Sequence, residues 1–209
     1  MKISLELLTH IYPEGPKNLR AFIDPINYIF DRYKINTPKR QAAFFGQVAV
    51  ESLQLTRLRE NTNYMHHPEH ETPRLVQLWP RLFTTAEALR YEGKPERIAS
   101  RIYANKYGNG DEASGDGWLY RGGGALMLTF KDQYKLCGDA IGVDLVKQPE
   151  LIAQPRYAIE SAGWYWDYRK LNDWADNGNL ALLTERINTA KLDLNKRVAF
   201  TDKAMKVLA

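Results

Sequence analysis

The sequence contains a single cysteine, Cys137, among 209 residues. One thiol cannot form an internal disulfide or supply a zinc site built on several thiolates, so neither kind of cross-link is expected to hold the fold. No apolar run approaches the roughly 18 residues that a membrane-spanning helix needs. A chain of this length can bury its own hydrophobic core, and we expect one domain over residues 1–209.

Charge of one sign is not concentrated anywhere in the chain. Lys and Arg number 29 against 25 Asp and Glu, which gives a net charge of +4 and a pI near 9.0. Because the basic residues are spread along the sequence, ordinary surface charge is favoured over a nucleic-acid interface. The small surplus would still attract the chain to a polyanion such as a bacterial cell wall.

The amino-terminal segment does not match a secretory signal, because Glu6 interrupts its apolar stretch and no small-residue cleavage site follows. We therefore expect synthesis in the cytoplasm. From the composition we also expect no stable membrane insertion, no nucleic-acid partner and a monomeric state.

Helical periodicity covers most of the chain. The predicted helices are 3–11, 17–34 with a break at Pro25, 38–58, 74–82, 85–92, 95–107, 131–141, 156–170, 179–190 and 194–208. Residues 107–124 contain seven glycines among eighteen positions, together with Trp118, Tyr120 and Arg121, which favours an ordered loop. The pattern predicts a mainly α-helical fold with two lobes and a groove lined by this loop.

The predicted helix over 38–58 places a carboxylate on its inward face. Thr37 is suited to the N-cap and Pro38 to the first helical position. One stripe of this helix contains Gln41, Phe44, Val48 and Leu55. Glu51 falls on the same stripe, where a carboxylate must be paired, hydrogen-bonded or shifted to a higher pKa. Glu51 is therefore either a structural ion-pair partner or a general acid kept protonated by apolar surroundings.

A second carboxylate, Glu60, follows nine residues later, after Arg57 and Arg59. It is expected in a polar, partly solvated environment. Two carboxylates with unlike surroundings are the arrangement that glycoside hydrolysis uses. In an unbroken helix they would be about 13 Å apart along the axis, so the chain is expected to bend after Leu58.

Four motifs occur in one order: FFGQVAVES at 44–52, LxxLRENTNY at 55–64, GDGWLYRGGGALMLT at 115–129 and LTERINT at 183–189. Together they resemble the signature of glycoside hydrolase family 19, which includes plant chitinases and the lysozyme-type endolysins of phages and prophages of Gram-negative bacteria. The likeness extends from about residue 20 to the carboxyl terminus.

The resemblance implies a lysozyme-like helical fold that cleaves β-1,4 bonds between N-acetyl amino sugars with inversion, without a metal or cofactor. It implies Glu51 as general acid, Glu60 as general base and Thr129 as the residue that helps hold the attacking water. The residues implied or favoured for substrate binding are Tyr64, Trp118, Tyr120, Arg121, Gln133, Asn188 and Arg197. We expect an endolysin whose partner is the glycan strand of peptidoglycan and which acts in the periplasm after release, through holin pores in the case of a phage.

Several polar groups of the family pattern are missing. The substituted positions are Val50 for His, Gly123 for Arg, Met127 for Gln, Gln133 for Asn, and Thr189 and Ala190 for two glycines. Each lost hydrogen bond to a sugar is worth roughly 0.5 to 1.5 kcal/mol. Gly123 is expected to leave the acid without a neighbouring arginine. Two alternatives therefore stay open: a catalytically impaired peptidoglycan-binding protein on the same scaffold, and a chitinase acting on chitin.

Three other features have simpler interpretations. The group His66, His67, Glu69 and His70 is interrupted by Pro68, so an exposed loop is favoured over a zinc site. Trp164 and Trp166 have helical spacing, which favours core packing over sugar stacking. Thr129 and Asp132 have the spacing of a capping box for the helix at 131–141.

Overall fold

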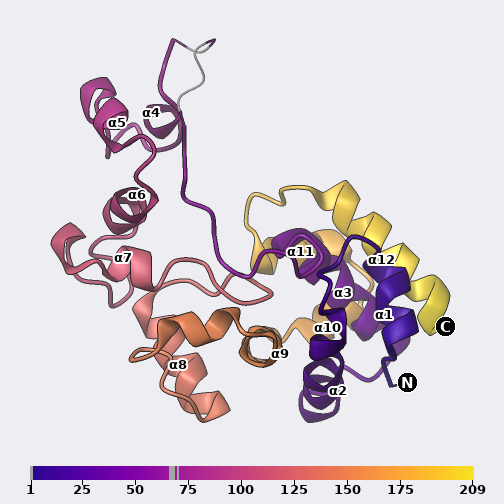
Figure 1. Ribbon diagram of the computed structural model, residues 1–209. Coiled ribbons are helices and arrows are strands. Elements are labelled where there is room, and N and C mark those ends of the chain that lie inside the picture. Colours follow the sequence, from indigo (N-terminus) through magenta and orange to yellow (C-terminus); the bar gives the residue numbers. More distant parts are fainter. Residues whose placement is uncertain (1, 66–68, 70) are drawn as a thin grey trace.

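The computed structural model describes residues 2–65, 69 and 71–209, and helices dominate this part of the chain. Figure 1 shows two lobes, with both termini on the same one. This first lobe contains α1 (Leu5–Ile11), η1 (Leu19–Phe22), α2 (Ile23–Arg32), α3 (Pro38–Glu51), α10 (Leu171–Asp176), α11 (Leu180–Ile187) and α12 (Leu194–Leu208).

The second lobe is built from the middle of the chain. It contains α4 (Arg74–Leu78), α5 (Thr85–Tyr91), α6 (Pro95–Ile102), η2 (Glu112–Ser114), α7 (Asp116–Leu119), α8 (Lys131–Ile141) and η3 (Pro149–Ala153). Helix α9 (Pro155–Tyr168) packs between α2 and α8 and connects the lobes. Within the described residues, pairing of extended backbone is confined to the bridges Arg59↔Gly123 and Gly123↔Leu128. None of the helices described has the length and apolar character needed to cross a membrane.

Helix α3 is the centre of the first lobe. The Thr37 side chain accepts a hydrogen bond from the Arg40 backbone N–H and Pro38 occupies the first turn, as predicted. Every residue from 41 to 49 is buried, so α3 is enclosed on all sides and not merely packed along one stripe. The missing side chain of Gly46 lets α12 approach closely, since a Cβ there would lie 2.8 Å from the Arg197 carbonyl oxygen. This contact brings Arg197 beside the carboxyl end of α3.

The structure differs from the predicted helices at several boundaries. Helix α3 ends at Glu51 and not at residue 58, and the break predicted at Pro25 falls before Ile23. The predicted capping box is wrong: Phe130 is the N-cap of α8 and makes no side-chain cap, while the Thr129 hydroxyl donates to the Met127 carbonyl at 2.9 Å. Residues 171–176 and 116–119 are additional short helices.

Two further predictions concern aromatic and histidine residues. The core assignment of the tryptophans is confirmed, because Trp166 is fully buried and Trp164 is 8% exposed. Residues 66–68 and 70 lie outside the described residues, so the exposed loop predicted around His66, His67 and His70 stays a prediction.

The contact between α5 and α6 makes stability depend on pH. Glu87 accepts a backbone hydrogen bond from Thr84 at 3.0 Å and pairs with Arg101 at 2.8 Å. The Thr84 hydrogen bonds and the Arg101 guanidinium lower the pKa of Glu87 to about 2. A carboxyl with a depressed pKa contributes stability above its ordinary pKa, and this contribution is lost as the pH falls through 2.

We expect the thermal midpoint of the wild type to fall more steeply between about pH 5 and about pH 2 than that of Glu87→Gln, which keeps the shape of the cap but does not titrate. Thermal unfolding followed by circular dichroism at several pH values measures both slopes. Parallel curves for the two proteins would contradict this assignment.

Candidate active site

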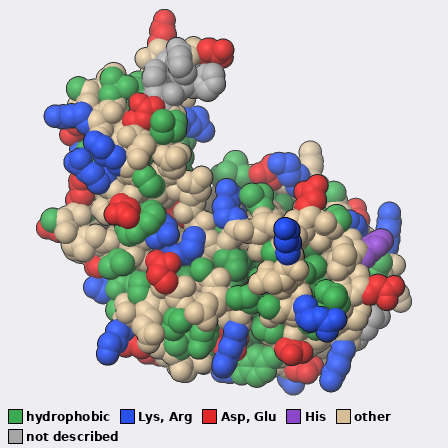
Figure 2. All heavy atoms as spheres, in the orientation of Figure 1, with side chains coloured by type: hydrophobic (Ala, Val, Ile, Leu, Met, Phe, Trp, Pro, Cys, Tyr) green, Lys and Arg blue, Asp and Glu red, His purple; other side chains and the backbone are tan. Residues whose placement is uncertain are grey.

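A cleft of about 360 Å³ lies between the lobes, where Figure 2 shows the molecule hollowed. Its lining residues are Val50, Glu51, Arg57, Glu60, Asn61, Tyr64, Met127, Asn188, Leu192, Asp193 and Arg197. Five residues predicted from the sequence thus share one cavity, namely Glu51, Glu60, Tyr64, Asn188 and Arg197. They come from the end of α3, the extended segment that follows it, the end of α11 and the start of α12.

Glu51, the last residue of α3, is paired with an arginine. Its Oε1 accepts a hydrogen bond from Arg197 Nη2 at 2.7 Å, and the Glu51 side chain is 15% exposed whereas that of Arg197 is 1% exposed. Of the two alternatives predicted for Glu51, the ion pair is the one observed: a buried guanidinium contacts one of its oxygens, so its surroundings are not only apolar. The other oxygen, Oε2, makes no hydrogen bond within the described part of the chain.

The Arg197 guanidinium is fixed by three acceptors. Besides Glu51, Nη1 donates to Gln47 Oε1 at 2.7 Å and Nε donates to the Leu192 carbonyl at 3.1 Å. Gln47 in turn donates to Thr184 Oγ1 at 3.0 Å. Sequence analysis missed Gln47, although it lies four residues before Glu51 and therefore on the same face of α3. The network joins α3, α11 and α12 beneath the cleft.

A strained turn follows Glu51 and returns the chain to the cleft. Leu53, Gln54 and Leu55 all have positive φ, from 47° to 69°, which is unfavourable for residues with a side chain. Two side-chain hydrogen bonds hold the turn: Ser52 Oγ accepts from the Leu55 N–H at 3.0 Å, and Gln54 donates to Glu14 at 3.1 Å. The bend thus occurs at 52–56 and not after Leu58, because the burial of Leu55 and the Gln54–Glu14 contact determine it.

Glu60 has different partners from Glu51. Its two carboxylate oxygens accept from the Tyr103 hydroxyl at 2.8 and 2.9 Å, and Oε2 also accepts from the Gly122 N–H at 3.1 Å. Burial, together with the adjacent Glu60 charge, raises the pKa of the Tyr103 phenol well above its usual value, so the hydroxyl keeps its proton and donates. The polar, partly solvated environment predicted for Glu60 is confirmed, because its carboxylate accepts hydrogen bonds and the residue is only partly buried. Nothing in the local sequence pattern had indicated Tyr103.

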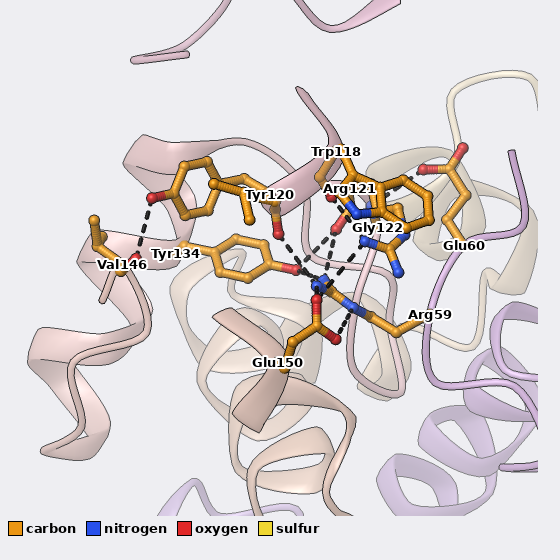
Figure 3. Close-up of polar contacts among 10 residues, drawn as sticks. Arg59, Glu60, Trp118, Tyr120, Arg121, Gly122, Tyr134, Val146 and Glu150 are labelled. Atoms are coloured by element: carbon orange, nitrogen blue, oxygen red, sulfur yellow. Dashed lines mark hydrogen bonds and ion pairs between the residues drawn. The ribbon is translucent and has the colours of Figure 1, made fainter. Parts of the chain in front are cut away.

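Arg59 fastens the glycine-rich loop beside Glu60, as Figure 3 shows. Its Nη1 donates to the Tyr134 hydroxyl at 2.5 Å and to the Arg121 carbonyl at 3.3 Å, and Nη2 pairs with Glu150 at 2.5 Å. The Glu60 N–H also donates to the Gly122 carbonyl at 2.8 Å. These contacts hold the Gly122 N–H against the Glu60 carboxylate.

Comparison with known proteins shows the family of the chain. The family described as Chitinase class I, Glyco_hydro_19, matches residues 33–175. The chain is 35% identical over 198 residues to a glycosyl hydrolase family 19 domain-containing protein of Haemophilus influenzae, which covers 94% of this chain and 92% of the relative. The chain belongs to glycoside hydrolase family 19. It is accordingly a glycosidase with a lysozyme-like helical fold.

More distant family 19 proteins share shorter segments or the fold alone. Chitinase 11 of Oryza sativa subsp. japonica is 46% identical over 48 residues, which is 22% of this chain and 19% of that protein. The crystal structure of chitinase C from Streptomyces griseus HUT6037 superposes with a TM-score of 0.64 at 18% identity, covering 99% of this chain and 92% of that one.

Several family 19 motif residues do not line the cleft. The substrate contact predicted for Tyr120 is wrong, because its buried ring packs on Tyr134 and its hydroxyl donates to the Val146 carbonyl at 3.1 Å. Arg121 is buried beneath the loop, with its guanidinium 3.4 Å from the centre of the Trp118 ring and Nη1 donating to the Trp118 carbonyl. Arg121 therefore packs on Trp118 inside the protein and is not a surface side chain. Trp118, Gln133 and Thr129 are half-buried outside the cleft lining.

Gly123 does not have the position relative to the acid that the sequence suggested. A Cβ at Gly123 would lie 2.5 Å from both the Tyr134 hydroxyl and Ile152, so a side chain has no room there. The expectation that Glu51 lacks an arginine neighbour is also wrong, because Arg197 provides one. Among the residues that the structure describes, no three His, Cys, Asp or Glu side chains are close enough to hold a metal ion together.

Proposed function

We propose that this family 19 glycosidase is a peptidoglycan-degrading endolysin that hydrolyses β-1,4 bonds between N-acetyl amino sugars with inversion. The observation that carries the proposal is that Glu51 and Glu60 share one cleft but have unlike partners, an arginine for one and a phenol with a backbone N–H for the other. The net charge of +4 favours association with an anionic cell wall.

Inversion requires an acid and a base on opposite sides of the scissile bond, with room for water between them. We assign Glu51 as the acid, since its Oε2 is available to protonate the glycosidic oxygen. The negative charge that then develops on Glu51 is stabilised by Arg197. We assign Glu60 as the base that accepts a proton from the attacking water, because Tyr103 and Gly122 fix its orientation.

Two other cleft residues are suited to hold the sugar. Asn188 Oδ1 accepts from the Ala190 N–H at 3.2 Å, which orients the amide nitrogen and leaves it to donate to an N-acetyl carbonyl. Tyr64 packs edge-on against Trp79 with ring centres 5.2 Å apart and presents its exposed part to the cleft. We further propose that the enzyme is made in the cytoplasm and reaches the wall after release.

The proposal is tested by mass spectrometry of fragments from purified sacculi, with proton NMR of the first anomer released. We expect new reducing-end amino sugars and an initial α anomer. Cleavage of chitin oligomers but not of sacculi would identify a chitinase. Sedimentation with sacculi without any new reducing ends would identify a binding protein, and either result would overturn the proposal.

Tyr103 is expected to act through Glu60, as a positioning residue. Tyr103→Phe keeps the ring that packs edge-on against Phe130 but removes both hydrogen bonds to Glu60. We expect kcat to fall about tenfold with KM almost unchanged, because substrate binding does not use this hydroxyl. Steady-state kinetics separate the two constants. A rise in KM with unchanged kcat would show that the hydroxyl serves binding instead.

A further inference from the structure

Arg57 is an exposed arginine on the wall of the catalytic cleft, and its guanidinium has no partner among the residues that the structure describes. It makes no side-chain hydrogen bond or ion pair with any residue that the structure describes. Arg59 and Arg197 behave differently, since each makes several polar contacts. The five side-chain N–H donors of Arg57 therefore have no acceptor among the described residues.

The acidic residues of the cleft do not account for Arg57. Glu51 is paired with Arg197, and Glu60 is held by Tyr103 and by the Gly122 N–H. Asp193, the third carboxylate of the lining, pairs with Lys196 at 2.8 Å. Because the carboxylates that line the same cleft already have their own partners, Arg57 is left available for a group that arrives with the substrate.

The backbone that places Arg57 in the cleft is strained. The three positive-φ residues of the turn at 53–55 come just before it, and its own N–H donates to the Ser52 carbonyl at 2.9 Å. Strained backbone of this kind persists only where surrounding contacts determine it, and it is concentrated at functional sites. The turn places Arg57 in the same cleft as the acid that lies six residues earlier.

The chemistry of a guanidinium selects its ligand. Arginine binds carboxylates through two parallel charged hydrogen bonds, which neutral hydroxyl and acetamido groups cannot match. Chitin carries no carboxylate. Peptidoglycan carries carboxylates on its stem peptides, and its muramic acid exposes a lactyl carboxylate where the peptide has been removed.

We infer that Arg57 is a specificity-determining residue that binds a carboxylate of the substrate and favours anionic peptidoglycan strands over neutral chitin. This inference rests on the proposed function, since it names the substrate feature that the same cleft recognises. Arg57 does not take part in proton transfer. Its contribution appears in the relative rates on charged and uncharged glycans.

The test compares kcat/KM on peptide-bearing glycan strands with kcat/KM on N-acetylglucosamine oligomers. We expect Arg57→Gln to lower this ratio about tenfold, and Arg57→Lys, which keeps the charge but not the planar fork, to lower it about threefold. Arg20→Gln is the matched control, because Arg20 is exposed on η1, outside the cleft lining. Its ratio is expected to stay within about twofold of wild type, which excludes an effect of net charge alone.

A third substrate, glycan stripped of peptides by an amidase, identifies which carboxylate is bound. A loss confined to peptide-bearing strands assigns the stem peptide, and a loss confined to stripped strands assigns the lactyl group. Equal losses on charged and neutral glycans would overturn the inference while leaving the hydrolase intact. If the wild type cuts none of the substrates, the proposed function fails. The role of Arg57 is then tested by the ratio of the binding affinities for sacculi and for chitin, which Arg57→Gln is expected to lower.

Discussion

Replacing Glu51 with glutamine is expected to lower kcat for glycan cleavage by about 10³-fold or more, within the range typical of a lost general acid. An amide cannot protonate the glycosidic oxygen at neutral pH. Because glutamine keeps the shape of the side chain and can still accept a hydrogen bond from Arg197, KM should change little. Release of reducing ends from sacculi, followed under single-turnover conditions, measures the chemical step directly.

Two controls separate chemistry from folding in this experiment. Glu185→Gln makes the same change on α11 of the same lobe, where the carboxylate pairs with Lys191 outside the cleft lining, and should leave kcat within about twofold. Circular dichroism of Glu51→Gln should show a folded protein. A variant that keeps more than about a tenth of wild-type kcat would require another proton donor.

Local signals in the sequence predicted where α3 begins but not where it ends. Thr37 and Pro38 act on the backbone within a few residues of themselves, so their effect can be read from the sequence. The end at Glu51 depends on contacts with distant segments. Gln54 bonds to Glu14, 40 residues away, and Leu55 is buried in the core of the first lobe. Periodicity alone continues the helix through these positions.

The two carboxylates of the site could be predicted because they belong to short local motifs, whereas the contacts that hold them could not. Glu51 and Glu60 are close together in the sequence and belong to recognisable motifs. The groups that hold them come from far away: Arg197 is 146 residues from Glu51, and Tyr103 is 43 residues from Glu60. Placement of Arg197 in the cleft followed from the family resemblance, while Tyr103 carried no motif signal.

The errors in the glycine-rich loop have a physical cause. Aromatic and arginine side chains in a loop next to a groove are equally suited to face the groove or to anchor the loop from beneath. Tyr120 and Arg121 anchor it, because burial of their rings and methylenes and their bonds to backbone carbonyls stabilise the loop. The contact that this segment makes with Glu60 comes instead from a backbone group, the Gly122 N–H, which sequence patterns of side chains do not reveal.

Removal of Arg197 is expected to reduce both stability and catalysis. Arg197→Met leaves the Glu51 carboxylate and the Gln47 carbonyl without their donor in a largely buried place. Loss of one partner from such a pair costs about 3 to 5 kcal/mol in the free energy of unfolding. We also expect kcat to fall about 10²-fold, because the charge that develops on Glu51 loses its stabilising cation. Urea denaturation and steady-state kinetics at neutral pH measure the two effects.

The double variant Glu51→Gln/Arg197→Met separates the structural role of the pair from its catalytic role. In that protein neither charge remains, so the loss of stability should be smaller than the sum of the two single losses by about 1 kcal/mol or more. The kcat should nevertheless stay at the low value of Glu51→Gln, because restoring the electrostatic balance does not restore a proton donor. Strictly additive losses of stability would mean that Glu51 and Arg197 do not interact in solution. A double variant more active than Glu51→Gln would mean that Arg197 suppresses catalysis instead of supporting it.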